Sequence, residues 1–254
     1  MRSTSENGVP GTRPEGARDE REAAAHVREM FGRIAPRYDL LNHLLSLDID
    51  KVWRRRVAKR FRAVLHNPSA RVLDLCCGTG DLALAFHREA PVGAEIVGSD
   101  FVPEMLERAR AKAAVSGGGV KFVEADALSL PFADETFDLV SCSFGFRNLA
   151  NYERGMLEIF RVLKPGGAAA ILEFSEPRGK LFGSVYRFYF RRVLPRLGGL
   201  ISGNGSAYTY LPSSVSKFPS PEGLRGLFER AGYINVRYQR WTGGIVTLHV
   251  ATKQ

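Results

Sequence analysis

The residues best suited to chemistry gather around a glycine-rich turn and the acidic side chains that follow it. Gly78 and Gly80 stand between a short apolar run and a helical pattern. Glycines there let the backbone approach a ligand closely, and the start of the helix exposes free N–H groups. Asp74, Asp100 and Asp126 each end one of three consecutive predicted strands. Because strand ends form the ligand-binding edge of an open α/β sheet, this spacing predicts a nucleoside site rather than a tight turn with three solvated aspartates.

The same residues indicate which nucleoside fits. Asp100 lies ~20 residues beyond the glycines, where an acidic side chain accepts hydrogen bonds from ribose hydroxyls. Ala83 replaces the third glycine of a dinucleotide-binding fingerprint, and no Gly-Lys-Ser/Thr sequence is present to hold a phosphate. Acidic residues without a basic one suit a nucleoside that carries positive charge and no phosphate. S-adenosylmethionine has that chemistry.

Short β-branched runs alternate with helical segments, which is the pattern of a parallel sheet covered on both faces. The predicted strands are 71–75, 95–100, 120–126, 137–144 and 168–175, with helices over 80–90, 103–115 and 151–163. A helix over 220–231 and an antiparallel hairpin, with strands over 233–241 and 245–252, end the chain. We therefore expect an α/β, Rossmann-like fold with a mostly parallel seven-stranded sheet, an antiparallel C-terminal strand and N-terminal helices.

The chain is expected to form a single domain over residues 25–254, preceded by a disordered polar tail over 1–24 that has almost nothing to bury. Residues 25–66 carry apolar side chains at helical spacing, interrupted by Pro36 and by a turn around 48–50, and predict a helical cap. Residues 178–215 combine an aromatic, basic helical stretch with a Gly/Ser/Tyr loop. They predict an insertion that faces the substrate or a membrane.

The composition is that of a globular protein, with 44% hydrophobic and 25% charged residues. No apolar run approaches the roughly 20 residues of a membrane-spanning helix, and no apolar signal segment opens the chain, so we expect a cytoplasmic protein. Cys76, Cys77 and Cys142 offer neither a disulfide framework nor the spacing of a zinc site, and no metal is expected. The formal charge of +9 fits nucleic acid, an anionic bilayer or an acidic substrate.

Several separate blocks resemble those of known methyltransferases. Residues 130–138 and 162–167 resemble blocks of the Rossmann-like methyltransferases in general. Four more blocks resemble the ubiquinone/menaquinone biosynthesis C-methyltransferase family, namely MFGRIAPRYDLLN (30–42), SFGFRN (143–148), YLPSSVSKFPSP (210–221) and TGGIV (242–246). The likeness spans roughly residues 27–252. It implies methyl transfer from S-adenosylmethionine to a ring carbon of a polyprenylated hydroquinone, which in bacterial members is demethylmenaquinol.

The resemblance also implies which residues contact the cofactor. Thr79 lies in the glycine turn, Asp100 at the ribose, Asp126 and Ala127 at the adenine, and Ser143 beyond the fourth strand. The predicted cofactor site is completed by Asp74, Gly78, Gly80 and Phe101.

Methylation of carbon needs an electron-rich ring, so the expected substrate is the reduced quinol, whose phenolic proton must be lost or shared. We assign Arg147 to the developing oxyanion, with Asn148 orienting it or the hydroxyl. Tyr38 and Asp39 are expected to close the site at the methionine end or to relay a proton; otherwise they are an amphipathic core residue and a helix cap. His43 and His249 are further potential bases, although a lone histidine is more often structural.

The expected substrate has a long apolar tail, so the protein must meet a membrane or shelter that tail. Residues 181–197 place aromatic and basic side chains at helical spacing, and residues 51–62 hold seven Lys or Arg in twelve positions. Each segment predicts either contact with an anionic bilayer at the inner face of the membrane or a solvated basic helix face. The aromatic segment could instead form a homodimer. No aromatic RNA-binding platform is recognisable, so nucleic acid is not an expected partner.

Two alternative functions remain at this point. One is methylation of a polyprenyl benzoquinol in ubiquinone biosynthesis. The other is a non-catalytic, nucleoside-binding subunit of a quinone-biosynthesis assembly, against which the intact glycine turn and strand-end acids argue.

Overall fold

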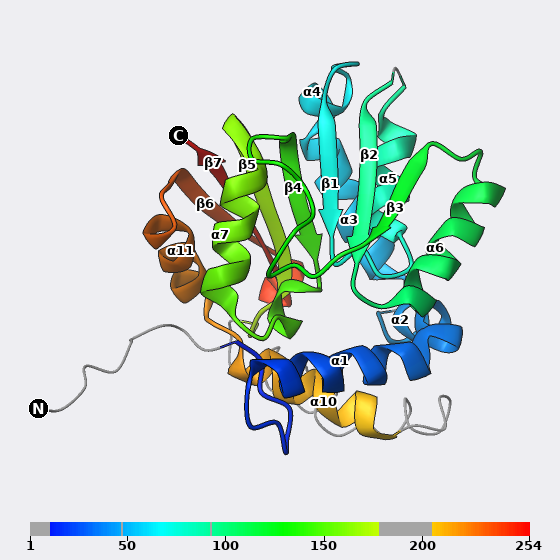
Figure 1. Cartoon of the computed structure of the whole chain (residues 1–254), viewed down its shortest axis with the longest axis vertical. Coiled ribbons are helices and arrows are strands. Elements are labelled where there is room, and N and C mark those ends of the chain that lie inside the picture. Colours follow the sequence, from blue (N-terminus) through cyan, green and yellow to red (C-terminus); the bar gives the residue numbers. More distant parts are fainter. Residues whose placement is uncertain (1–10, 47, 92, 178–204) are drawn as a thin grey trace, which may run out of the picture.

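A seven-stranded sheet forms the centre of the protein (Figure 1). The structure, a computed structural model, describes residues 11–46, 48–91, 93–177 and 205–254. The strands are β1 (Arg71–Leu75), β2 (Glu95–Asp100), β3 (Val120–Glu124), β4 (Phe137–Ser143), β5 (Leu163–Phe174), β6 (Tyr233–Trp241) and β7 (Val246–Lys253). Their order is β3-β2-β1-β4-β5-β7-β6, and β7 runs antiparallel to both of its neighbours. The mostly parallel sheet with an antiparallel C-terminal strand is thus confirmed.

The direction in which strands are added reverses between β1 and β4, which pair in parallel at the middle of the sheet. Such a reversal leaves a crevice beyond the carboxyl ends of the two strands. The central strands are buried on both faces, and Leu73 and Leu139 are fully enclosed. Two covered faces explain why these segments read as continuous apolar runs rather than as alternating patterns.

Helices cover both faces of the sheet. On one face α7 (Tyr152–Val162) packs against β5 and α11 (Pro221–Arg230) packs against β6 and β7, with Met156 and Phe228 in the shared core. On the other face α3 (Ile49–Arg60) and α5 (Asp81–Glu89) pack through Trp53 and Phe86. In Figure 1, α7 lies in front of the sheet and α3 behind it. The helix α6 (Pro103–Val115) packs against β2 and β3.

The N-terminal helices cover the crevice. They are α1 (Glu20–Ile34), the short 3₁₀ turn η1 (Ala35–Arg37), α2 (Tyr38–Ser46), α3 and α4 (Arg62–Leu65), so the expected breaks at Pro36 and around 48–50 are present. In Figure 1, α1 and α10 (Gly205–Lys217) lie side by side across the carboxyl ends of the strands. In that view α1 and α10 close the crevice from below. No helix among the described residues is long and apolar enough to cross a membrane.

The prediction of a disordered tail up to residue 24 is wrong for residues 11–24. The α1 helix begins at Glu20, and the Asp19 side chain caps it by accepting a hydrogen bond from the backbone of Glu22. Upstream, the Thr12 backbone donates to the carbonyl of Leu149 at 2.7 Å. Composition misled the prediction because this segment is held by backbone hydrogen bonds and a helix cap, which need few apolar side chains.

Most other boundaries agree with the expected ones. The strands β1, β2 and β6 have the predicted ends, whereas β5 begins at Leu163, five residues earlier than expected. Of the predicted insertion over 178–215, the structure describes only the part that belongs to α10. The aromatic segment 181–197, with the membrane and dimer predictions that rest on it, lies outside the described residues.

Candidate active site

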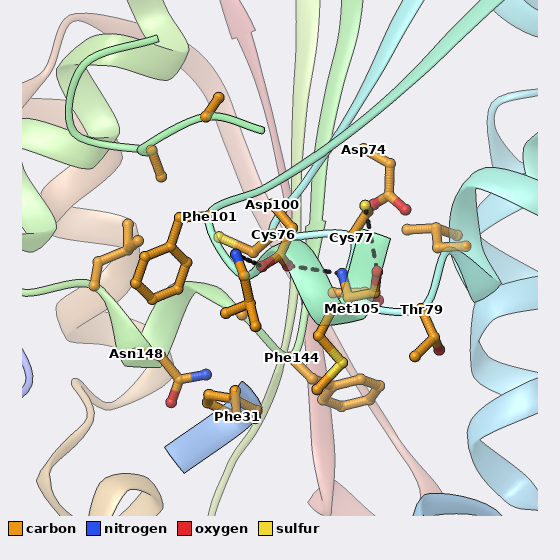
Figure 2. A pocket seen from close by; sticks show the side chains of 18 of the residues that line it. Phe31, Asp74, Cys76, Cys77, Thr79, Asp100, Phe101, Met105, Phe144 and Asn148 are labelled. Carbon is orange, nitrogen blue, oxygen red and sulfur yellow. Dashed lines mark hydrogen bonds between the residues drawn. The ribbon is translucent and has the colours of Figure 1, made fainter. Parts of the chain in front are cut away.

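A pocket lies at the carboxyl ends of β1, β2 and β4, beneath α1 and the start of α2. Together with the open space at its mouth it comprises about 930 Å³. Figure 2 shows Asp100 near its centre, with Phe101 and Asn148 to one side and Thr79 to the other. The crevice predicted by the strand order is therefore a real cavity.

The glycine turn gives the pocket its floor. Gly78 and Gly80 have φ angles of +55° and +82°, a backbone conformation that side-chain-bearing residues rarely adopt. At Gly80 a Cβ atom would also lie 3.0 Å from the ring of Phe122. Gly80 then caps α5, so the free N–H groups of that helix begin beside the pocket.

Asp100 ties this turn to the end of β2. One carboxylate oxygen accepts the Gly78 N–H at 2.8 Å and the other accepts the Val102 N–H at 3.0 Å. Burial raises the pKa of Asp100 to about 6, although these backbone hydrogen bonds act to lower it. Each oxygen keeps a further lone pair that could accept a ligand hydroxyl.

Asp74 lies deeper, at the end of β1. Its Oδ2 accepts the Ala83 N–H at 2.9 Å, while its Oδ1 has no hydrogen-bond partner among the described residues. Burial raises the pKa of Asp74 to about 8, so the free protein holds this carboxyl protonated near neutral pH. The hydroxyl of Ser143, at the end of β4, is also buried beside the pocket without a described partner. Such unpaired buried atoms mark places where a ligand can supply the missing hydrogen bond.

Asp39, which lies outside the pocket lining, meets the lining residue Thr79 where α2 contacts the glycine turn. The Thr79 hydroxyl donates to Asp39, and the Lys112 ammonium donates to Asp39 at 3.0 Å and to Thr79 at 3.1 Å. Lys112 also forms an ion pair with Asp81. This network holds the N-terminal helices against the glycine turn, and within it Asp39 has a structural task.

Arg147 lies behind the pocket wall rather than in it. Its Nη1 pairs with Glu173 at 3.0 Å, its backbone N–H donates to the same carboxylate, and its guanidinium lies 5.4 Å from the centre of the Phe174 ring. Burial acts to lower the pKa of Arg147, but the Glu173 charge raises it above its usual value. The ion pair shows that Arg147 does not point a free charge into the described cavity.

Asn148, the next residue, does line the pocket. Its Oδ1 accepts a hydrogen bond from the Tyr210 hydroxyl at 3.0 Å, and that hydroxyl lies 3.1 Å from Oγ1 of Thr12. Three distant parts of the sequence, namely the N-terminal segment, the end of β4 and α10, therefore meet at one amide.

Ten of the thirteen predicted site residues line the pocket. Those ten are Tyr38, Asp74, Gly78, Thr79, Asp100, Phe101, Asp126, Ala127, Ser143 and Asn148. Gly80, Asp39 and Arg147 lie outside its lining. His249 is not part of the lining; it is buried on β7, where it stacks on the ring of Phe228.

Sequence reasoning missed several lining residues, above all Phe31, Met105 and Arg54. Phe31 and Met105 come from α1 and α6 and pack with Tyr38 and Phe101 into an apolar wall. Arg54 comes from the basic segment 51–62, for which the sequence predicts only a surface role. The sequence does contain a signal for the burial of Arg54. Val57 and Phe61 follow it by about one and two helical turns, so the three side chains share the apolar face of the helix.

The cysteines belong to the pocket floor. Cys76 and Cys77 line it. The neighbouring Cys142 thiol and burial raise the pKa of Cys76, and burial raises that of Cys77, so both thiols stay protonated near neutral pH. Among the described residues, no group of three or more His, Cys, Asp or Glu is placed to hold a metal ion.

The lining chemistry fits S-adenosylmethionine. This nucleoside carries a sulfonium, an ammonium and one carboxylate, and the described lining offers four carboxyl groups and one guanidinium. The carboxyl groups belong to Asp74, Asp81, Asp100 and Asp126. With the unpaired Asp74 and Ser143 oxygens, the sheet order and the glycine turn, these features define a Rossmann-like protein with a site for a cationic nucleoside.

Comparison with known proteins gives the family. The model of the ubiE/COQ5 methyltransferase family matches residues 17–253. The chain is 50% identical over 236 residues to the demethylmenaquinone methyltransferase of Deinococcus radiodurans, covering 93% of this chain and 96% of that protein. It is 54% identical over 224 residues to the demethylmenaquinone methyltransferase of Thermus thermophilus, covering 88% and 100%. The chain therefore belongs to the ubiE/COQ5 methyltransferase family and is an S-adenosylmethionine-dependent methyltransferase.

A solved structure shares the fold. It is a SAM-dependent methyltransferase of Thermotoga maritima, described as a possible histamine N-methyltransferase, with a TM-score of 0.63 and 19% identity. The match covers 90% of this chain and 100% of that one. At this identity the likeness bears on the fold alone.

Proposed function

We propose that the chain transfers a methyl group from S-adenosylmethionine to a ring carbon of demethylmenaquinol, which gives menaquinol. The observation that carries the proposal is the similarity, over nearly the whole chain, to two demethylmenaquinone methyltransferases at 50% and 54% identity. The acidic lining of the pocket supports it, because a cationic methyl donor is attracted to such a lining.

In the proposed cofactor site, Asp100 accepts hydrogen bonds from the ribose hydroxyls through its remaining lone pairs. Asp126 and Ala127 face the adenine, and Phe101 packs beside it. At the methionine end, Gly78 and Gly80 shape the turn. Thr79, Asp74 and Ser143 supply polar contacts there. Thr79 already donates its hydroxyl proton to Asp39, so its side chain offers the cofactor an acceptor rather than a donor.

Bound S-adenosylmethionine supplies an electrophilic methyl group on a sulfonium sulfur. The quinol ring carbon would form the new C–C bond as the C–S bond breaks to leave S-adenosylhomocysteine, and the same carbon would then release its proton to solvent. Negative charge that develops on the quinol oxygen must be met by donors already in place. The reduced ring is required because the ring of an oxidised quinone is electron-poor and does not act as a carbon nucleophile.

Tyr38 and Asn148 are the residues we assign to the quinol oxygen, since both line the pocket. Burial raises the pKa of Tyr38, which keeps its phenol a hydrogen-bond donor at neutral pH. Asn148 accepts from Tyr210 through Oδ1, which leaves its NH₂ group to donate. Arg147 acts as a positioning residue, because its pair with Glu173 fixes the backbone next to Asn148. Asp39 likewise acts through Thr79.

The test is methyl transfer to a defined quinol. Purified protein is incubated with methyl-labelled S-adenosylmethionine and a short-chain demethylmenaquinol kept reduced by dithionite, and the lipid fraction is analysed by mass spectrometry. We expect one added methyl group with the reduced naphthoquinol and none with the oxidised quinone. Preference for a benzoquinol would support the ubiquinone alternative, and the absence of product from both, despite cofactor binding, would support the non-catalytic one.

We also propose that the outer face of α3 contacts an anionic membrane. The exposed residues of this face are Arg55, Arg56, Lys59 and Arg60, beside the partly exposed Ile49 and Val52. Basic side chains next to exposed apolar ones are typical of helices that lie on anionic lipid. A membrane contact would bring the enzyme to a substrate whose tail is dissolved in the bilayer.

Co-sedimentation with vesicles tests this contact. We expect binding to phosphatidylglycerol-containing vesicles that weakens with salt, and little binding to pure phosphatidylcholine. The double variant Arg55→Glu/Lys59→Glu should lose binding, whereas Lys121→Glu, a charge reversal on β3, should keep it. Binding that ignores lipid charge and salt would contradict the proposal.

A further inference from the structure

Arg54 is the one cationic side chain in the described lining of the pocket. It reaches the cavity from α3, and only 8% of the residue is exposed. Asp81, 3.9 Å from Arg54, lines the same pocket, and Lys112 joins Asp81 to Thr79, so these side chains lie close together. A buried guanidinium costs free energy unless its donors are used, so its presence in a ligand cavity requires an explanation.

Packing holds the Arg54 guanidinium in one place. Its Nη1 makes an ion pair with Asp50, one turn earlier on α3, and lies 3.9 Å from the Asp81 carboxylate. The guanidinium carbon lies 5.5 Å from the centre of the Phe144 ring. A guanidinium restrained by an aromatic ring and two carboxylates is a preorganised binding group, because little side-chain entropy remains to be lost on binding.

Both contacts use the same nitrogen. Within the described part of the chain, Nε and Nη2 of Arg54 form no hydrogen bond. The guanidinium fork that these two atoms form matches the two oxygens of a carboxylate. The fork therefore retains donors that a ligand in the cavity can use.

The charges at this end complement an amino-acid zwitterion. Asp81 supplies a carboxylate and Asp74 supplies the unpartnered Oδ1 for an ammonium, and Arg54 supplies the single cation of the described lining for a carboxylate. The methionine part of S-adenosylmethionine has this pair of charges. We infer that Arg54 binds the α-carboxylate of the cofactor's methionine and so selects cofactors and products that carry it. The inference rests on the proposed orientation of the cofactor, with its ribose at Asp100.

Isothermal titration with a matched ligand pair tests the inference. The ligands are S-adenosylhomocysteine and its analogue without the carboxylate, S-adenosyl-3-thiopropylamine. Wild-type protein should bind S-adenosylhomocysteine roughly 10- to 100-fold more tightly than the analogue, the range expected for a charge-assisted hydrogen-bond pair. Arg54→Met should lose that preference by weakening S-adenosylhomocysteine while leaving the analogue nearly unchanged.

Further variants separate binding from folding. Arg54→Met leaves Asp50 without its guanidinium, so the double variant Arg54→Met/Asp50→Asn removes that buried charge and should show the same loss of preference. Arg54→Lys, which keeps the charge but not the fork, should give an intermediate loss. Arg55→Met, an exposed neighbour on the same helix, should leave both affinities unchanged.

The outcomes distinguish this inference from the proposed function. If neither ligand binds wild-type protein, the proposed cofactor site itself is wrong. If both bind wild-type protein equally, or if Arg54→Met weakens both by the same factor, the carboxylate is not held by Arg54 and the inference is overturned.

Discussion

Replacing Asp74 with Asn should remove a large pH dependence from the stability of the protein. Asp74 is 1% exposed, one of its oxygens has no described partner, and burial raises its pKa from 3.8 to about 8. Between these two values the folded chain binds a proton that the unfolded chain has released. Its contribution to stability is therefore greatest at low pH and falls as the pH rises.

The size of the effect follows from the width of this window. Each pH unit inside it lowers the unfolding free energy by about 1.4 kcal/mol, so the loss between pH 5 and pH 8 is about 4 kcal/mol. The Asn variant has no proton to exchange and can keep the hydrogen bond from the Ala83 N–H. Its stability relative to wild type should therefore rise by that amount over the same range.

Guanidinium unfolding of both proteins at pH 5, 6, 7 and 8, without cofactor, measures this difference. Comparing the two proteins cancels the titrating groups that they share and that do not interact with Asp74. A difference that stays constant from pH 5 to pH 8 would refute the reasoning, because it would mean that Asp74 ionises in the folded protein as it does in the unfolded chain.

Three further predictions test other parts of the structure. Tyr210→Phe removes the hydrogen bond to Asn148 and should lower kcat by about fivefold, the worth of one neutral hydrogen bond, without changing the Kd of S-adenosylhomocysteine. An unchanged kcat would show that Asn148 needs no such support. Burial lowers the pKa of His249 from 6.5 to about 4. The contribution of the neutral imidazole to stability is therefore complete above pH 6.5 and is lost as the pH falls towards 4. In denaturation curves measured between pH 4 and pH 7, His249→Gln should reduce this loss of unfolding free energy at acid pH. Gly145→Ala would place a Cβ atom 2.3 Å from Cβ of Cys76, so it should lower the unfolding free energy by roughly 1–3 kcal/mol, and a variant as stable as wild type would mean that the strand ends move freely.

The sheet was predictable because its signals are local. The central strands β1 and β2 are buried runs between turn residues, and Asp74 and Asp100 near their carboxyl ends mark where they enter the pocket. The glycine turn is equally local, since Gly78 and Gly80 adopt positive φ angles within a few residues. These features place most of the cofactor site without any knowledge of tertiary contacts.

What the sequence could not reveal were pairings between distant segments. Arg147 meets Glu173, 26 residues away, and that contact turns an expected free cation into a buried ion pair. Asp39 meets Lys112 across 73 residues, and so lies in a structural network instead of the cavity. In the sequence Arg54 is one of seven basic residues in the segment 51–62. Its burial follows from the packing of α3 against the sheet, which the sequence does not show.

The contacts of Gly11 and Arg13 with Ala150 have a practical consequence for protein engineering. Arg13 donates to the carbonyl of Ala150 at 2.7 Å, and Gly11 lies so close to the same residue that a Cβ atom there would overlap its backbone. A fusion partner or affinity tag joined just before Gly11 would therefore be held close to Ala150, a residue that lines the pocket. A carboxyl-terminal tag, following β7 at the opposite end of the strands, is the safer choice for kinetic work.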